Sequence, residues 1–166
     1  DPYGKTFKNR KRHSPESVKL AKTIADESTV LLKNENQLLP LDTKSLKSIA
    51  IIGPNADQVQ FGDYTWSRNN KDGVTPLQGI KNRVNKNTAI HYAKGCSLTS
   101  LDTSGIAEAV EAAKNSEVAV IFGGSASAAL ARDYKSSTCG EGFDLNDLNL
   151  TGAQSQLIRE VYRTGT

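Results

Sequence analysis

Three short apolar runs divide the chain, at residues 49–52, 89–93 and 118–122. The first and the third show no alternation of apolar and polar positions, and each ends at glycine, Gly53 and Gly123. Such runs are typical of strands that are buried on both faces of a sheet. We therefore predict three strands, of which the middle one has the weaker signal.

Elsewhere apolar residues recur at helical spacing, behind residues that favour helix starts. We expect helices at residues 15–33 and after the N-caps Thr75, Ser104 and Thr151. Ser14 precedes Pro15, a residue suited to the first helical position. Gln78 and Gln154 stand three residues after their caps, where a capping box requires them.

Helices and strands alternate with short connections. This order predicts an α/β layered sandwich with a mainly parallel sheet and helices on both faces. A further strand should follow the last helix, so we expect the sandwich to be incomplete at Thr166. The chain has no methionine and opens with Asp1, so we expect it to be cut from a longer protein.

Composition narrows the function classes. The chain has 166 residues, of which 37% are hydrophobic and 23% charged, values that fit a globular domain. Its formal net charge of +3 is too small to indicate nucleic-acid binding, and no apolar run is long enough for a membrane span. The two histidines, His13 and His91, lie far apart, so we expect no structural zinc site and no His-based triad. Nothing in the sequence implies a metal or an organic cofactor.

Two long irregular stretches, residues 55–73 and 123–150, each follow the carboxyl end of a predicted strand. Ligands of open α/β sheets bind at that edge, so we look for chemistry there. The turn after the first strand is no dinucleotide fingerprint, and a nucleotide site has little support. Cys96 and Cys139 should leave the same edge, which keeps both a disulfide and two free thiols open.

Two residues in these stretches are candidates for a site. Trp66, the only tryptophan, has polar neighbours and could offer a flat apolar face to a sugar ring, although a lone tryptophan belongs more often to a core. Glu141 stands between Gly140 and Gly142, which allow the backbone to approach a ligand closely. Most loop carboxylates are merely solvated, and spacing alone does not make Glu141 catalytic.

Several motifs in fixed order nevertheless resemble the second domain of glycoside hydrolase family 3. They are DESTVLLKNE at 26–35, LLPL at 38–41, IIGPNAD at 51–57, GDYT at 62–65, VTPLQGI at 74–80, YAKGC at 92–96 and GEGFD at 140–144. Each motif is modest, but their ordered combination is specific and covers nearly the whole chain. Leu145 and Thr151 depart from the family's usual Arg and Pro, which leaves the substrate subset open.

The resemblance implies a retaining β-glycosidase, first of all a β-glucosidase, that hydrolyses terminal β-linked sugars. Residues 1–14 would be the linker from a preceding (β/α)8 barrel, and residues 15–166 a truncated α/β sandwich. It also implies that Glu141 is the acid/base, that Trp66 lines the aglycone side, and that the nucleophilic aspartate lies in the barrel, outside this chain. Family members are often periplasmic or secreted, which we expect here too.

Other functions stay open at this point. The chain could be a β-xylosidase of the same family, or a non-catalytic carbohydrate-binding α/β module that holds sugar with Trp66. A flavodoxin-like nucleotide binder is supported only by the alternation of elements, which is analogy of fold. A preceding barrel with an aspartate in the family's nucleophile setting would distinguish a family 3 glycosidase from the binding module and the nucleotide binder.

Overall fold

The computed structural model of the chain describes residues 14–62, 64, 73–127 and 137–166. The chain divides after Leu41 into two compact units. Trp66 lies outside the described residues, so its expected place on the aglycone side stays a prediction. The expected domain limits, 1–14 and 15–166, stay a prediction as well.

The first unit contains helix α1, Pro15–Ser28, and the short 3-10 helix η2, Glu35–Gln37. As predicted, Ser14 caps α1, with its hydroxyl oxygen accepting a hydrogen bond from the Ser17 amide at 3.2 Å. The helix ends at Ser28 rather than at the predicted Lys33. The hydroxyls of Ser28 and Thr29 both donate to the carbonyl of Ala25, and side-chain bonds of this kind compete with the helical ladder.

The second unit is built on a three-stranded parallel sheet in the order β2-β1-β3. Strand β1 is Ser48–Ile52, β2 is Ala89–Ala93 and β3 is Val118–Ile121, close to the predicted runs. The central strand pairs on both sides, with Ile51 opposite Tyr92 and Val120. The predicted α/β class with a parallel sheet is confirmed.

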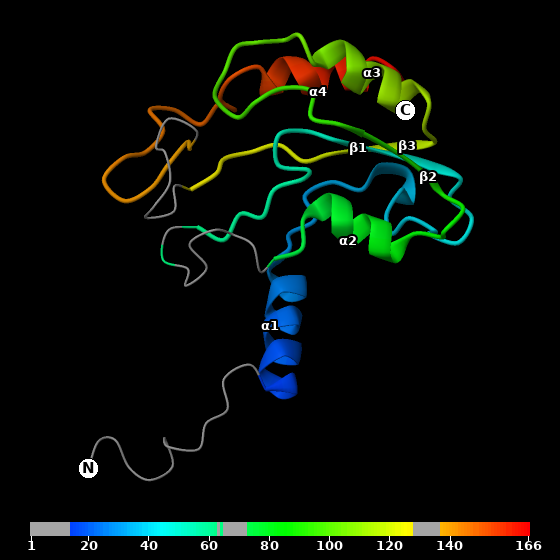
Figure 1. Cartoon of the computed structure of the whole chain (residues 1–166), viewed down its shortest axis with the longest axis horizontal. Coiled ribbons are helices and arrows are strands. Elements are labelled where there is room, and N and C mark those ends of the chain that lie inside the picture. The colour runs from blue at the N-terminus through cyan, green and yellow to red at the C-terminus, as the bar shows by residue number, and fades with distance from the viewer. Residues whose placement is uncertain (1–13, 63, 65–72, 128–136) are drawn as a thin grey trace. The chain divides into compact units, whose positions relative to one another are not determined.

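Helices cover both faces of this sheet (Figure 1). Helices α3, Ile106–Lys114, and α4, Gln154–Tyr162, lie on one face, and α2, Pro76–Arg83, lies on the other. The side chains of β1 alternate between the faces, so Ala50 and Ile52 join the core under α3 and α4. Ile49 and Ile51, equally buried, point to the side of α2.

The predicted helix starts had mixed outcomes. Thr75 caps α2, with its hydroxyl oxygen accepting from the Gln78 amide at 3.1 Å, but the Gln78 side chain donates to Asn82 instead of closing a capping box. Helix α3 begins after Gly105, not after Ser104, because the Ser104 hydroxyl donates to Asp102. The box predicted at Thr151 does not form either.

Candidate functional site

The carboxyl edge of the sheet collects the segments that follow all three strands. The Gly53 amide donates to the carbonyl of Ala93 at 3.1 Å, and the Asn55 amide donates to the carbonyl of Phe122 at 3.1 Å. These bonds link the end of β1 to the ends of both neighbours. Since β1 and β3 are adjacent, the two long stretches that follow them leave the sheet side by side.

A cleft of about 320 Å³ opens at this edge. Its lining is more polar than apolar and mixes both kinds of residue: Pro54, Gln58, Gln60, Lys94, Ser97, Leu98, Thr99 and Ala126. The amides and hydroxyls can donate and accept hydrogen bonds, and the Lys94 ammonium can donate them, which suits a polyhydroxylated ligand. Glu141 does not line this cleft.

Hydrogen bonds hold the segment that follows β1. The Thr75 hydroxyl donates to the Asp57 carboxylate at 2.8 Å, and the Leu77 amide donates to the Ala56 carbonyl at 2.8 Å. These bonds join the end of β1 to the start of α2. Partial burial, with smaller contributions from the carboxylates of Asp57 and Glu108, raises the pKa of Tyr92.

Glu141 occupies a tight turn. The Gly140 amide donates to the Phe143 carbonyl at 3.1 Å, and the Phe143 amide donates back to Gly140 at 3.3 Å. Glu141 and Gly142 are therefore the two central residues of a hairpin-like turn, and Gly142 has a φ of +83°. A positive φ at the third position of a turn favours glycine. The turn presents the exposed Glu141 at its tip.

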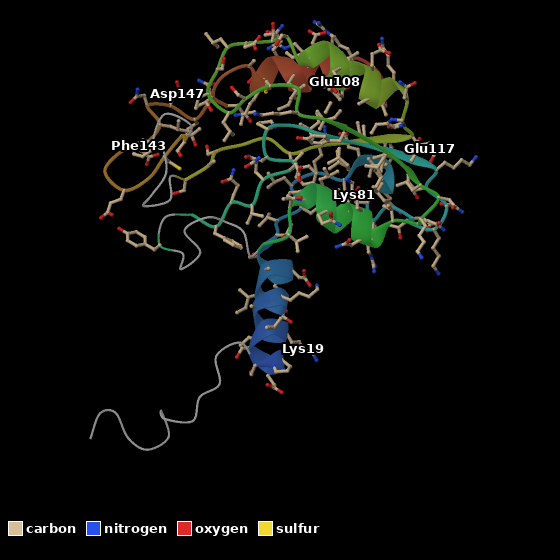
Figure 2. All side chains as sticks on the ribbon, viewed as in Figure 1. Lys19, Lys81, Glu108, Glu117, Phe143 and Asp147 are labelled. Carbon is tan, nitrogen blue, oxygen red and sulfur yellow. The ribbon has the colours of Figure 1, made fainter. Side chains whose placement is uncertain are left out.

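Figure 2 shows that the stretch bearing this turn lies at the carboxyl edge. Glu117, just before β3, lies at one end of the sheet, and Phe143 and Asp147 lie at the other. Asp144 and Asp147 each accept a hydrogen bond from a nearby backbone amide, Leu145 at 2.8 Å and Asn149 at 2.7 Å. These bonds give both carboxylates a local structural role.

The chemistry of other side chains is limited in the part of the chain that the structure describes. Both cysteines are free, so the alternative of two thiols holds. No group of three or more His, Cys, Asp or Glu within the described ranges is arranged to hold a metal ion. Nor does any helix among these residues have the length and apolar character needed to cross a membrane.

Sequence reasoning missed one residue of this edge, Gln154. The sequence predicts a capping box for Gln154, but the residue is only 1% exposed, and its side-chain amide forms hydrogen bonds with the backbone of Gly124 and Leu98. The signal was present, because Gln154 shares the inner stripe of α4 with Leu157 and Val161. A polar residue at an apolar position of a helix indicates a buried hydrogen-bond partner.

Comparison with known families decides the assignment. Residues 29–166 match the family model described as the glycosyl hydrolase family 3 C-terminal domain. The chain belongs to this family. The resemblance of the ordered motifs is thereby confirmed, as is the class of the fold.

Individual family 3 relatives cover nearly all of the chain. A β-xylosidase from Formosa agariphila is 38% identical over 90% of the chain and 20% of its own length. A periplasmic β-glucosidase from Salmonella typhimurium is 34% identical over 89% of the chain and 21% of its own length. A solved β-glucosidase from Erythrobacter marinus superimposes with a TM-score of 0.75 at 30% identity, over 93% of the chain and 23% of that structure. The chain thus spans about a fifth of the length of the curated relatives it matches.

Proposed function

We propose that the protein is a retaining β-glycosidase that releases terminal β-linked sugars, with Glu141 as its acid/base. The observation that carries the proposal is the turn Gly140–Phe143, which presents an exposed carboxyl group at the carboxyl edge of the sheet in a family 3 chain. In this role Glu141 protonates the departing glycosidic oxygen and later takes a proton from the attacking water.

A retaining glycosidase needs a second carboxylate about 5–5.5 Å from the first. We propose that this nucleophile is an aspartate of a (β/α)8 barrel that precedes residues 1–14, and that residues 15–166 act as the sandwich domain beside it. It follows that the isolated chain should not hydrolyse aryl β-glycosides. Turnover by the purified chain that disappears in Glu141→Gln would contradict this division of labour.

Glu141→Ala in the full-length protein tests the acid/base role. We expect kcat/KM on an unactivated disaccharide to fall about 10²–10⁴-fold, the usual contribution of general acid/base catalysis. An activated aryl glycoside should keep most of its kcat/KM, because its leaving group departs without a proton. Azide, which needs no base, should restore turnover on that substrate and give a glycosyl azide of retained configuration.

Asp144→Ala is the matched control, since Asp144 is also an exposed carboxylate of the same stretch. It should show neither the leaving-group dependence nor the azide effect. Near-normal hydrolysis of the disaccharide by Glu141→Ala would move the role to another carboxylate. Asp144 and Asp133 would then be the next to test, and Asp133 lies outside the described residues.

The sugar that the enzyme releases is proposed to be xylose or glucose. Relatives named as β-xylosidase and as β-glucosidase both match most of the chain, so aryl β-xylosides and aryl β-glucosides are the substrates to compare first.

We further propose that Trp66 lines the aglycone side: Trp66→Ala should raise KM for disaccharides with little change in melting temperature. A large loss of melting temperature with an unchanged KM would place Trp66 in a core instead.

Location is also a proposal. The Salmonella relative is named as periplasmic, and on this ground we propose a periplasmic or secreted enzyme. Fractionation of the native host, with activity followed on the aryl glycosides above, tests it. Activity confined to the cytoplasmic fraction would contradict it.

A further inference from the structure

The Gln154 side chain forms hydrogen bonds with both backbone polar groups of one residue, Gly124. Its Oε1 accepts from the Gly124 amide at 2.8 Å, and its Nε2 donates to the Gly124 carbonyl at 3.1 Å. The same Nε2 lies 3.3 Å from the Leu98 carbonyl, in the segment after β2. Two opposed bonds to one residue fix the direction of its backbone, and burial makes their loss costly.

These bonds join the two ends of the stretch that carries Glu141. Gly124 lies just after β3, and Gln154 is the first residue of α4. The Thr151 hydroxyl donates to the Leu98 carbonyl at 2.6 Å, and the Ala153 amide donates to the Ser100 carbonyl at 3.0 Å. The far end of the stretch is therefore held against the segment after β2 as well.

A second tie lies between Gly124 and Glu141. The Thr138 hydroxyl oxygen accepts from the Ala126 amide at 2.8 Å, and the Thr138 amide donates to the Ala126 carbonyl at 2.9 Å. Thr138 is only 4% exposed. Glu141 follows three residues later, in the turn that Gly140 and Phe143 close.

We infer that Gln154 is a positioning residue for Glu141, acting through Gly124 and the Ala126–Thr138 tie to hold the glutamate turn in place relative to the sheet. The inference rests on the proposed acid/base role of Glu141. A general acid must lie within about 2.6–3.2 Å of the oxygen it protonates. A displacement of about 1 Å far from the chemistry can cost about 100-fold in rate, so a tie at the base of the stretch matters for catalysis.

Gln154→Met in the full-length protein tests the inference, because methionine keeps the length and burial of the side chain but removes its amide. We expect kcat/KM on an unactivated disaccharide to fall about 10–100-fold, and on an activated aryl glycoside by less than about threefold, since only the first needs a placed acid. Azide should raise turnover of the aryl glycoside, as in Glu141→Ala. Equal losses on both substrates would overturn the inference.

Two matched controls separate positioning from stability. Gln156→Met makes the same change at an exposed position of the same helix and should leave both substrates unaffected. Leu157→Ala removes a core side chain of α4 that is 1% exposed and should lower the melting temperature. If Leu157→Ala alters the ratio of the two substrates as much as Gln154→Met does, the effect is structural and the inference is wrong.

The Thr138 pair keeps the test decisive if Gln154→Met does not fold. Thr138→Val is nearly isosteric but removes the hydroxyl oxygen that accepts from Ala126, whereas Thr138→Ser keeps it. The valine variant should show the leaving-group dependence and the serine variant should recover near-normal rates. Normal rates in the valine variant would overturn the inference.

Glu141→Ala, measured in the same experiment, distinguishes a failure of the positioning role of Gln154 from a failure of the acid/base role of Glu141. If it shows the leaving-group dependence while Gln154→Met and Thr138→Val do not, the positioning inference fails and the proposed function stands. If Glu141→Ala itself lacks that dependence, the proposed function fails, and the positioning inference fails with it.

Discussion

Gly53 lies so close to Phe122 that a Cβ added to Gly53 would stand 2.3 Å from the Phe122 carbonyl oxygen. That carbonyl belongs to the backbone that continues β3, so it cannot turn aside as a flexible side chain could. The φ of Gly53 is +118°, a value that residues with a Cβ rarely adopt. Only glycine fits where β1 passes into the segment that lines the cleft.

Gly53→Ala and Gly124→Ala form a matched pair that separates the contact from the backbone strain. Gly124 has a φ of +119°, but a Cβ there would meet no atom beyond its chain neighbours within 4 Å. We expect Gly124→Ala to cost about 1–3 kcal/mol from strain and Gly53→Ala more than about 4 kcal/mol. Urea unfolding measures both, and equal losses would show that the contact with Phe122 relaxes.

Gly142→Ala should strain the glutamate turn without a collision. The φ of Gly142 is +83°, and an added Cβ would meet open space. We expect a loss of about 1–2 kcal/mol, and a smaller loss for Gly142→Asn, because asparagine tolerates this conformation better. Gly79→Ala, within α2 and in ordinary contact with Val74, should instead stabilise by about 0.5–1 kcal/mol. A stabilising Gly142→Ala would mean that the turn adopts another conformation.

Leu157 and Ile158 are neighbours on α4 with opposite environments. Leu157 is 1% exposed within the core cluster, and Ile158 is 36% exposed. Leu157→Ala should cost about 2–5 kcal/mol, since it removes buried methyl groups and leaves a cavity. Ile158→Ala should cost less than half as much in the same unfolding experiment. Similar losses at the two positions would place α4 differently on the sheet.

Asp102 gives a pH-dependent signal. Its pKa is lowered first by the hydrogen bond from the Ser104 amide and then by that from the Ser104 hydroxyl. Because the folded-state pKa is depressed, its stabilisation is present above the unfolded-state pKa of about 3.9 and is lost as the pH falls through the folded-state value. Titration by NMR should show a higher pKa for Asp102 in Ser104→Ala. An unchanged value would mean that the hydroxyl bond does not persist in solution.

The two thiols should differ in reactivity. Cys96 is buried, and burial raises the pKa of its thiol although Lys94 opposes the change. The nucleophile is the thiolate, so Cys96 should react with iodoacetamide at pH 8 more slowly than the partly exposed Cys139. Mass spectrometry of the labelled peptides measures both rates, and denaturation should bring them closer together. Faster labelling of Cys96 in the native protein would contradict its burial.

The sequence predicted the strands well because their signal is local. The apolar runs at 49–52, 89–93 and 118–122 became β1, β2 and β3 with shifts of one residue at most. Helix limits were less accurate, since a hydroxyl group can bond several side-chain and backbone partners besides the helix start. Ser104 bonds Asp102 instead of capping α3, and the Thr151 hydroxyl bonds the Leu98 carbonyl instead of capping α4.

In the candidate site, too, features set by neighbouring residues were easier to predict than features set by distant partners. Glu141 could be singled out because its neighbours in the sequence, Gly140 and Gly142, form the turn that presents it. The partners of Gln154 and Thr138 could not be predicted, because they are backbone atoms of segments that only the folded sheet brings near. A buried amide reveals its role through its environment, and the sequence shows at most that a polar residue occupies an apolar stripe.

The order β2-β1-β3 has a consequence for the time course of folding. Ile49 must find both Ile90 and Val118, each far along the chain, and the entropy of closing such long loops is lost before the pairings stabilise anything. The bonds between Gly140 and Phe143, by contrast, close over three residues and can form early. The glutamate turn can therefore form in the nascent chain. Its position relative to the sheet is fixed only when α4 docks and Gln154 forms its hydrogen bonds with Gly124.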